Sequence, residues 1–330
     1  MSPSPVRSIL ERRVIVVSGK GGAGKTTVSA ALALAARDAG DRVLLAEVLK
    51  DGPIVRNFEP EANPVDYAGR ELRPGLTVMH IDPYEALSEY VRLQVGLPRA
   101  LTSWLRSRSF EQLMDAAPGW RELVVLGKVW HLEQMRDEEN RRSFDRIVID
   151  APASGHGLTF LDVPRVVVSA LRGGPLRDEA ARVEALVRDP DRTILVPVSL
   201  AEELAVQETA ELVERVRADV GIHVEAAIAN AVSSPPFAPP LKGLAEELEA
   251  LPAREELGDV PAPGILAACA RHLESRAQLH EHYRGELAKR TSLPVVALPL
   301  LPEGVRNAKD LQRLANILRA ASAVEGESGR

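Results

Sequence analysis

Residues 14–36 read VIVVSGKGGAGKTTVSAALALAA, and this stretch decides the fold class. An apolar run leads into Gly19, and after four further residues come Gly24, Lys25 and Thr26. Glycines let a backbone turn its N–H groups toward an anion, and the start of a helix adds a partial positive charge there. Because the motif stands between an expected strand and an expected helix, it predicts a phosphate-binding loop rather than a chance glycine-rich turn.

This loop covers residues 19–27 and predicts the binding of ATP with Mg²⁺. We expect Lys25 to contact the β- and γ-phosphates and the Thr26 hydroxyl to bind Mg²⁺. Lys20 is not needed to hold the loop. It either contacts a phosphate bound by another subunit, where it would stabilise the transferred phosphoryl group, or is a solvated loop lysine. The predicted nucleotide-binding residues of the loop are Gly19, Lys20, Gly21, Gly22, Ala23, Gly24, Lys25, Thr26 and Thr27.

A second apolar run, Asp145–Asp150, ends in a carboxylate and continues as Ala-Pro-Ala-Ser-Gly-His. A carboxylate at the carboxyl end of a central strand lies in the ligand crevice of an open α/β sheet, where Asp150 would hold Mg²⁺. The alternative is a helix N-cap. Ser154, Gly155 and His156 are predicted to form a switch loop that senses the γ-phosphate, although a structural role for the histidine stays open.

Apolar runs alternate with helical segments, which is typical of a mostly parallel α/β sheet covered by helices on both faces. The fold class is therefore that of a P-loop NTPase, with an inserted helical subdomain. The expected strands are Arg13–Ser18, Arg42–Val48, Leu76–Ile81, Asp145–Asp150, Thr193–Val198, His223–Ala229 and Pro294–Leu298, and helices are expected at Lys25–Asp38, Ala201–Ala218 and Val305–Ala320.

Two stretches are too long for simple crossovers and carry helical periodicity. The sequence predicts an ATPase core at 13–82, 141–232 and 292–322, helical insertions at 83–140 and 233–291, and flexible ends at 1–12 and 323–330. We expect the two insertions to pack together beside the nucleotide domain.

The composition restricts the class of partner. The 330 residues carry a net charge of −6, which argues against nucleic acid because a phosphate backbone favours a concentrated basic face. No run of 18 uncharged apolar residues is present, so we expect no transmembrane segment. The single cysteine, Cys269, suits a reducing compartment, and the absence of a recognisable secretory signal favours the cytoplasm.

Together these motifs resemble those of a known group of dimeric ATPases. The loop with two lysines is similar to the deviant Walker A motif of MinD, ParA and nitrogenase iron protein. Asp150–His156 resembles the switch II motif of the branch that contains the arsenite-pump ATPase ArsA and the Get-pathway ATPase. Further matches extend the resemblance over most of residues 13–320, and among them Glu208-Thr209 resembles the family's Glu-Thr pair.

The resemblance implies a homodimer, or a heterodimer with a related ATPase, that closes on ATP and reopens after hydrolysis. Lys20 would act across that dimer, and the nucleotide state would control a surface for an unidentified helical client or partner protein. Asn230 resembles the asparagine that reads adenine. Pro299–Arg306 resembles the loop that packs the purine, with contacts from Pro302, Glu303 and Val305.

The sequence departs from the family at switch I, where Leu49 stands in place of the aspartate that activates the attacking water. Leucine cannot accept a proton, so Glu47 and Asp51 are the candidates to replace it, although Glu47 could instead pair locally. Hydrolysis is then expected to be slow or to depend on a partner chain. The candidate catalytic residues are Lys20, Lys25, Glu47, Asp51 and Asp150.

The single cysteine and the first helical insertion restrict which client the protein could bind. One cysteine cannot build an arsenite site, because As(III) favours several thiolates. Cys269 and His272 would either share Zn²⁺ between two subunits or simply share a packed helix face. The aliphatic residues of 99–135 would form either a client groove, interrupted by charges such as Arg106, Arg108 and Glu111, or only the core of the insertion.

Two further hypotheses remain. One is a weakly hydrolysing nucleotide-binding subunit of a heterodimeric ATPase, which the leucine at switch I motivates. The other is a positioning ATPase of the MinD or ParA kind. Against the second, the C-terminal helix from Lys309 to Arg319 is less cationic than a membrane-binding helix and ends in a polar tail. Nitrogenase-type reduction needs two cysteines per chain for its cluster and is excluded.

Overall fold

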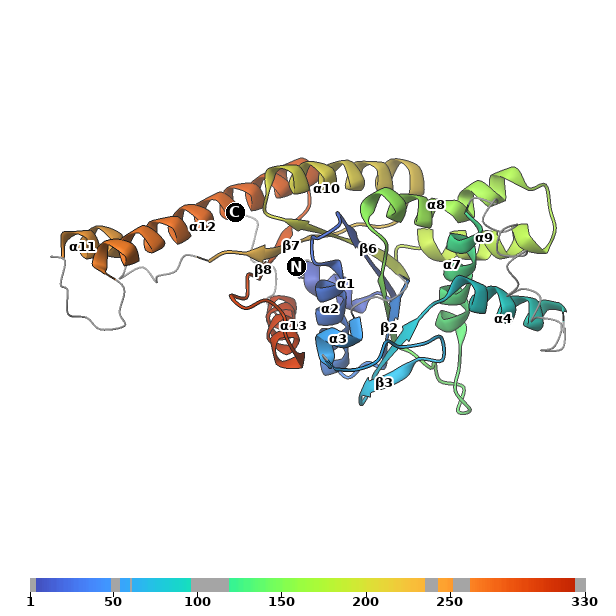
Figure 1. The fold of residues 1–330 in the computed structure, drawn as a ribbon. Coiled ribbons are helices and arrows are strands. Elements are labelled where there is room, and N and C mark those ends of the chain that lie inside the picture. Colours follow the sequence, from blue (N-terminus) through green and yellow to red (C-terminus); the bar gives the residue numbers. More distant parts are fainter. Residues whose placement is uncertain are drawn as a thin grey trace.

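An eight-stranded sheet lies at the centre of the protein, in the order β3-β4-β2-β5-β1-β6-β7-β8 (Figure 1). The computed structural model describes residues 4–48, 54–59, 61–95, 119–234, 243–251 and 262–323. All neighbouring strands are parallel except β3, which runs antiparallel to β4. The strands are β1 (Val14–Gly19), β2 (Val43–Glu47), β3 (Arg70–Arg73), β4 (Leu76–His80), β5 (Arg146–Asp150), β6 (Thr193–Leu200), β7 (Ala227–Val232) and β8 (Val295–Pro299). The predicted mostly parallel α/β fold is confirmed.

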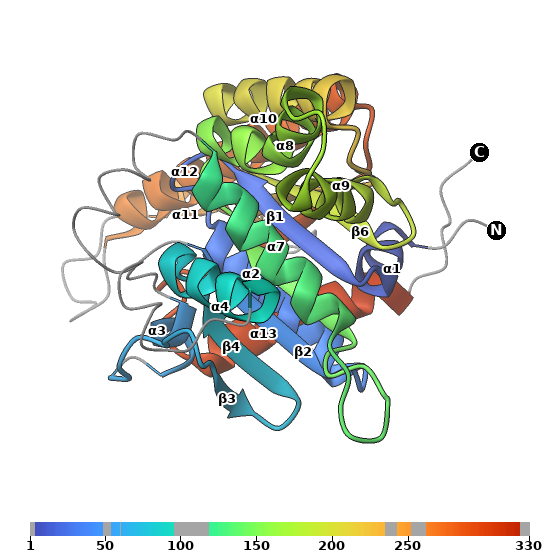
Figure 2. The same ribbon diagram turned by 90° about the vertical axis from the view of Figure 1, so that its right-hand side faces the viewer.

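Helices cover both faces of this sheet, with α2 and α13 on one side and α8 and α10 on the other (Figures 1 and 2). Alternate residues of β1 pack into the two cores, Ile15 and Val17 into one and Val14 and Val16 into the other. The helices are α1 (Pro5–Glu11), α2 (Lys25–Asp38), α3 (Ile54–Phe58), α4 (Pro83–Val95), α7 (Trp120–Gln134), α8 (Ser154–Ala170), α9 (Pro175–Arg188), α10 (Glu203–Arg215), which continues into a π-helix (Val216–Val220), α11 (Leu244–Ala250), α12 (Pro263–Thr291) and α13 (Ala308–Ala323).

The expected flexible end at residues 1–12 is wrong for residues 5–11, which form α1. Val6 and Ile9 are buried in the core beneath α2 and α13. Arg146 also donates a hydrogen bond to the backbone oxygen of Leu10 at 2.6 Å. A helix of seven residues is too short to be stable by itself. We infer that burial of Val6 and Ile9 on one of its faces stabilises α1, which the composition of this segment did not indicate.

In the parts of the two helical excursions that the structure describes, the helices of one do not pack on those of the other, which corrects the expected arrangement. In the first, α4 and α7 pack on each other, and α7 also packs on α8 and α9. In the second, α11 packs on α12, and α12 packs on α10, β7 and β8. Figure 1 shows the two groups at opposite ends of the molecule. The reason is the strand order. The first excursion connects β4 to β5 and the second connects β7 to β8, and these two pairs of strands lie on opposite sides of β1 in the sheet.

Several elements differ from the expected boundaries. The predicted strand at His223–Ala229 is shifted, because only an isolated bridge joins His223 to Ile194 and the continuous strand β7 is Ala227–Val232. The edge strand β3 and the helices α8 and α9 were not predicted. β3 escaped detection because its sequence, RELR, carries three charges and only Leu72 is buried.

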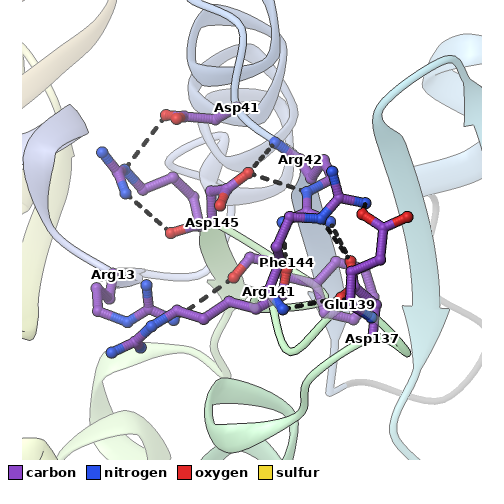
Figure 3. A network of polar contacts seen from close by, with 10 residues as sticks. Arg13, Asp41, Arg42, Asp137, Glu139, Arg141, Phe144 and Asp145 are labelled. Atoms are coloured by element: carbon purple, nitrogen blue, oxygen red, sulfur yellow. Dashed lines mark hydrogen bonds and ion pairs between the residues drawn. The ribbon is translucent and has the colours of Figure 1, made fainter.

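A polar network closes the amino edge of the sheet, opposite the phosphate loop (Figure 3). The backbone and guanidinium of Arg42 donate to Asp145, and Arg146 pairs with Asp41 at 3.3 Å. Buried Glu133 accepts from three arginines, namely Arg13 at 2.5 Å, Arg142 at 2.8 Å and Arg192 at 2.7 Å. Burying a carboxylate is costly unless it is paired, and these three arginines pair Glu133. The charged residues at the amino edge therefore have a structural role.

Candidate nucleotide-binding site

The phosphate loop joins β1 to α2 at the carboxyl edge of the three central strands β5, β1 and β6. Gly19 pairs with Val198 of β6, and a Cβ on Gly19 would lie 2.1 Å from the backbone oxygen of Val198. Gly24 precedes α2 with φ +85°, and no side chain caps this helix. The loop is therefore held by close backbone contacts and presents the free N–H groups of the first turn of α2 at the crevice.

Lys25 points inward from the first turn of α2. Its side chain is buried, and Nζ donates to the backbone oxygen of Lys20 at 3.2 Å. Burial lowers the pKa of Lys25, and the negative charge of Asp150 partly offsets that effect. An ammonium group held behind the loop with one weak acceptor is poised to bind an anion.

Asp150 lies at the end of β5 and is also buried. It accepts hydrogen bonds from the hydroxyls of Thr26 at 2.6 Å and Ser29 at 3.3 Å. Burial raises its pKa, and Thr26, Lys25 and Ser29 each act in the opposite direction. The residue before α8 is Ala153, so Asp150 is not the N-cap of that helix. A hydroxyl and a carboxylate at hydrogen-bond distance form an oxygen donor set that fits Mg²⁺.

Glu47 lies beside Asp150, because the two are direct partners in the parallel pairing of β2 with β5. The Glu47 carboxylate is buried and accepts a hydrogen bond from the backbone N–H of Ile54 at 3.2 Å. Burial raises its pKa to about 7, the Ile54 contact opposes the rise, and the charge of Asp150 adds to it. The other candidate, Asp51, and the neighbouring Leu49 lie outside the described residues.

We expect Glu47→Gln to stabilise the nucleotide-free protein above pH 7. The folded carboxyl titrates near pH 7 and the unfolded one near 4.5, so between these values only the folded chain keeps the proton. The stability of the wild type therefore falls as the pH rises through this window and is constant above it. The loss is about 3 kcal/mol, and a glutamine that is neutral at every pH avoids it.

Urea unfolding at pH 4.5 and pH 8 measures this effect. The variant should gain stability over the wild type at pH 8 and match it at pH 4.5. Glu214→Gln, at an exposed position of α10, is the matched control and should change the free energy of unfolding by less than about 0.5 kcal/mol. Equal stability of Glu47→Gln and the wild type at pH 8 would contradict the raised pKa.

Lys20 has a different hydrogen-bond partner from Lys25. Its Nζ donates to the Glu208 carboxylate at 2.6 Å, and both side chains are partly exposed. Glu208 belongs to α10, which follows β6, the neighbour of β1. Sequence reasoning identified both residues separately but not their contact, because they are 188 positions apart and no local pattern joins them.

Asn230 braces the phosphate loop from β7. Its Nδ2 donates to the backbone oxygen of Ala23 at 3.0 Å, and a Cβ on Gly24 would lie 2.1 Å from the same nitrogen. The strand expected here ends at Ala229, whereas Asn230 lies inside β7. After β8, Pro302 and Glu303 are exposed and Val305 is half-buried, so this loop is open to a ligand.

The remaining predicted positions are only partly described. The backbone of Ser154, Gly155 and His156 forms the first turn of α8 rather than a loop, and their side chains lie outside the described residues. Cys269 and His272 are exposed on α12. Among the described residues, no group of three or more His, Cys, Asp or Glu side chains is placed to hold a metal ion.

An apolar groove lies between α4, α7 and α9. The residues that line it include Leu87, Tyr90, Leu93, Val124, Trp130 and Leu176. On α7, Leu126 and Val129 belong to the core instead, whereas Val124 and Trp130 line the groove. Arg106, Arg108 and Glu111 lie outside the described residues. None of the described helices is long and apolar enough to cross a membrane.

Comparison with known proteins agrees with this geometry. The family model of anion-transporting ATPases of the ArsA type matches residues 12–173. ATPase BagA of Mycobacterium tuberculosis is 30% identical over 300 residues, which cover 86% of this chain and 88% of that protein. ATPase GET3 of Mycosarcoma maydis is 24% identical over 357 residues, covering 95% of this chain and 93% of that protein. An arsenical pump-driving ATPase of Acidiphilium multivorum is 27% identical over 235 residues, which cover 65% of this chain and 38% of that protein.

Proposed function

The chain belongs to the ArsA/Get-type family of ATPases, and we propose that it binds ATP with Mg²⁺ in the loop of residues 19–27 and hydrolyses it as a dimer. The observation that carries this proposal is the cradle itself. At Gly19 and Gly24 the backbone lies so close to Val198 and Asn230 that a side chain would not fit. Lys25, Thr26 and Asp150 converge behind the loop. These are the groups that a triphosphate tail and its cation require.

Each residue has a defined task in the proposed reaction. Lys25 would bind the β- and γ-phosphates, and Thr26 and Asp150 would hold a Mg²⁺ ion, which supplies neutralising charge to the phosphates when bound. Water attacks the γ-phosphorus in line with the departing ADP oxygen. Glu47 is the proposed acceptor of the water proton, because its pKa of about 7 suits a general base and its strand end adjoins that of Asp150. With leucine at position 49, we propose that turnover is slow.

The proposed output is a change in the helical surface of the dimer. The groove between α4, α7 and α9 exposes Leu93 and Leu176, by 59% and 49% respectively, and such a surface suits an apolar helix of a client protein. One relative is named an arsenical pump-driving ATPase, but a single cysteine does not supply the thiolates that As(III) requires. We therefore propose a protein client rather than arsenite.

Isothermal titration calorimetry with purified protein tests the proposal. ATP should bind with Mg²⁺ present and much more weakly after chelation with EDTA, and phosphate release should follow. Light scattering should show more dimer with a hydrolysis-resistant ATP analogue than without nucleotide. A folded sample that takes up no ATP would end the proposal. Fast turnover by the isolated chain would instead remove the alternative of a weakly hydrolysing subunit that needs a partner.

A further inference from the structure

The two lysines of the phosphate loop have different partners. Lys25 is buried and donates to the loop backbone, whereas Lys20 leaves the loop and pairs with Glu208 of α10 at 2.6 Å. The side chains of Lys20 and Glu208 are 39% and 41% exposed, so this ion pair lies at the rim of the site and not in the core. The acceptor belongs to the same chain as the lysine.

That pairing competes with the task that the family resemblance implies for Lys20, which is to act across the dimer on a phosphate bound by the other subunit. While the Lys20 ammonium is paired with Glu208, its charge is partly compensated and one of its N–H donors is occupied, so it attracts a phosphate bound by another subunit less strongly. A triphosphate carries more negative charge than one carboxylate, so nucleotide at the dimer contact competes for the lysine. The carboxylate of Glu208 and the phosphate of the second subunit therefore compete for the Lys20 ammonium.

We propose that Glu208 is a positioning residue, which retains Lys20 on its own subunit until a second subunit presents bound ATP. This inference rests on the proposed function and adds to it an intramolecular competitor for the lysine. Release of Lys20 is then one step of dimer closure, and Glu208 raises the ATP concentration at which the dimer forms.

The size of the effect follows from the exposure of the pair. Half-exposed ion pairs contribute little free energy to stability or binding. The range of these contributions corresponds to about a twofold to fivefold change in an equilibrium constant. We therefore expect Glu208→Gln to lower the ATP concentration for half-maximal dimer formation by about two- to fivefold. The difference should diminish in high salt, because partly exposed charges are screened.

A double-mutant cycle tests this expectation by light scattering during ATP titration. The wild type, Glu208→Gln, Lys20→Ala and the double variant are compared at low salt and at high salt. Glu208→Gln should shift the midpoint only when Lys20 is present. Glu214→Gln, on the same helix with the same charge change, should leave the midpoint unchanged.

A second readout does not depend on nucleotide. Reductive methylation, followed by peptide mass spectrometry, reports how freely the Lys20 amine reacts in the nucleotide-free chain. We expect about twofold faster methylation of Lys20 in Glu208→Gln than in the wild type or Glu214→Gln. Lys309, which is exposed on α13, serves as the internal standard.

Two outcomes would overturn the inference. One is a midpoint shift of the same size in the Lys20→Ala background, which would mean that Glu208 acts without the lysine. The other is equal methylation of Lys20 in the wild type and Glu208→Gln. Failure of the proposed function is distinguishable, because the wild type would then not bind ATP at all, while the methylation experiment would still report on the ion pair.

Discussion

Replacing Lys25 by alanine is expected to reduce ATP turnover by at least about 100-fold and ATP affinity by about 10- to 100-fold. The ammonium is the buried cation of the loop, and its Nζ has only the Lys20 backbone oxygen as a hydrogen-bond partner among the described residues. Charge-assisted hydrogen bonds to phosphate supply this affinity, and the same charge stabilises the transferred phosphoryl group.

The nucleotide-free Lys25→Ala variant should remain folded, because burial already disfavours the charged lysine, as its lowered pKa indicates. Phosphate release and calorimetry measure the effect, and thermal unfolding checks the fold. Lys309→Ala, at an exposed position of α13, is the control for loss of one positive charge. If Lys25→Ala keeps turnover within threefold of the wild type, this chain does not use its phosphate loop as proposed.

The second large effect is expected for Gly19→Ala, which should destabilise the fold by about 2–4 kcal/mol. The added Cβ would lie 2.1 Å from the backbone oxygen of Val198 and 3.1 Å from its carbonyl carbon. Val198 is held in β6 between β1 and β7, so neither strand can yield without losing sheet hydrogen bonds. The loop would also leave its position relative to α2, and ATP binding would weaken with it.

Gly21→Ala is the matched control, because nothing lies within 4 Å of a Cβ built at that position and it needs no left-handed backbone. Both variants gain one methyl group in the same loop, two residues apart. Urea unfolding followed by circular dichroism should separate them, with Gly21→Ala within about 0.5 kcal/mol of the wild type. Equal unfolding midpoints for the two variants would show that the close approach of the loop to β6 is not a constraint.

The predicted and observed structures agree best where the signal is local. Helix α2 runs from Lys25 to Asp38, as its sequence predicts, because glycine permits its start and the alanine-rich segment favours helix. The strand before it and the strand that ends at Asp150 were also found, since continuous β-branched runs are typical of parallel strands buried on both faces. Local agreement failed at α1 and β3, whose few apolar residues give weak periodicity.

In the candidate site too, the residues in local motifs were predicted, whereas the contacts between distant segments were not. Lys25, Thr26 and Asp150 were assigned to one site from their motifs. In the structure Thr26 donates a hydrogen bond to Asp150, and Lys25 donates one to the backbone oxygen of Lys20 in the same loop. The brace from Asn230 to Ala23 and the raised pKa of Glu47 were not foreseen in this form. Both depend on which strands are neighbours, and the strand order is not written in any single segment.

By itself, therefore, the sequence determined the α/β class, the phosphate loop and the carboxylate that faces it, because backbone conformation and helix formation follow from residues close in the chain. Only the tertiary structure decided that Lys20 meets Glu208, that Glu47 adjoins Asp150 and that the helical excursions lie at opposite ends. Those contacts join positions about 100 to 200 residues apart, and the order of strands in the sheet, set by packing of the whole core, brings them together.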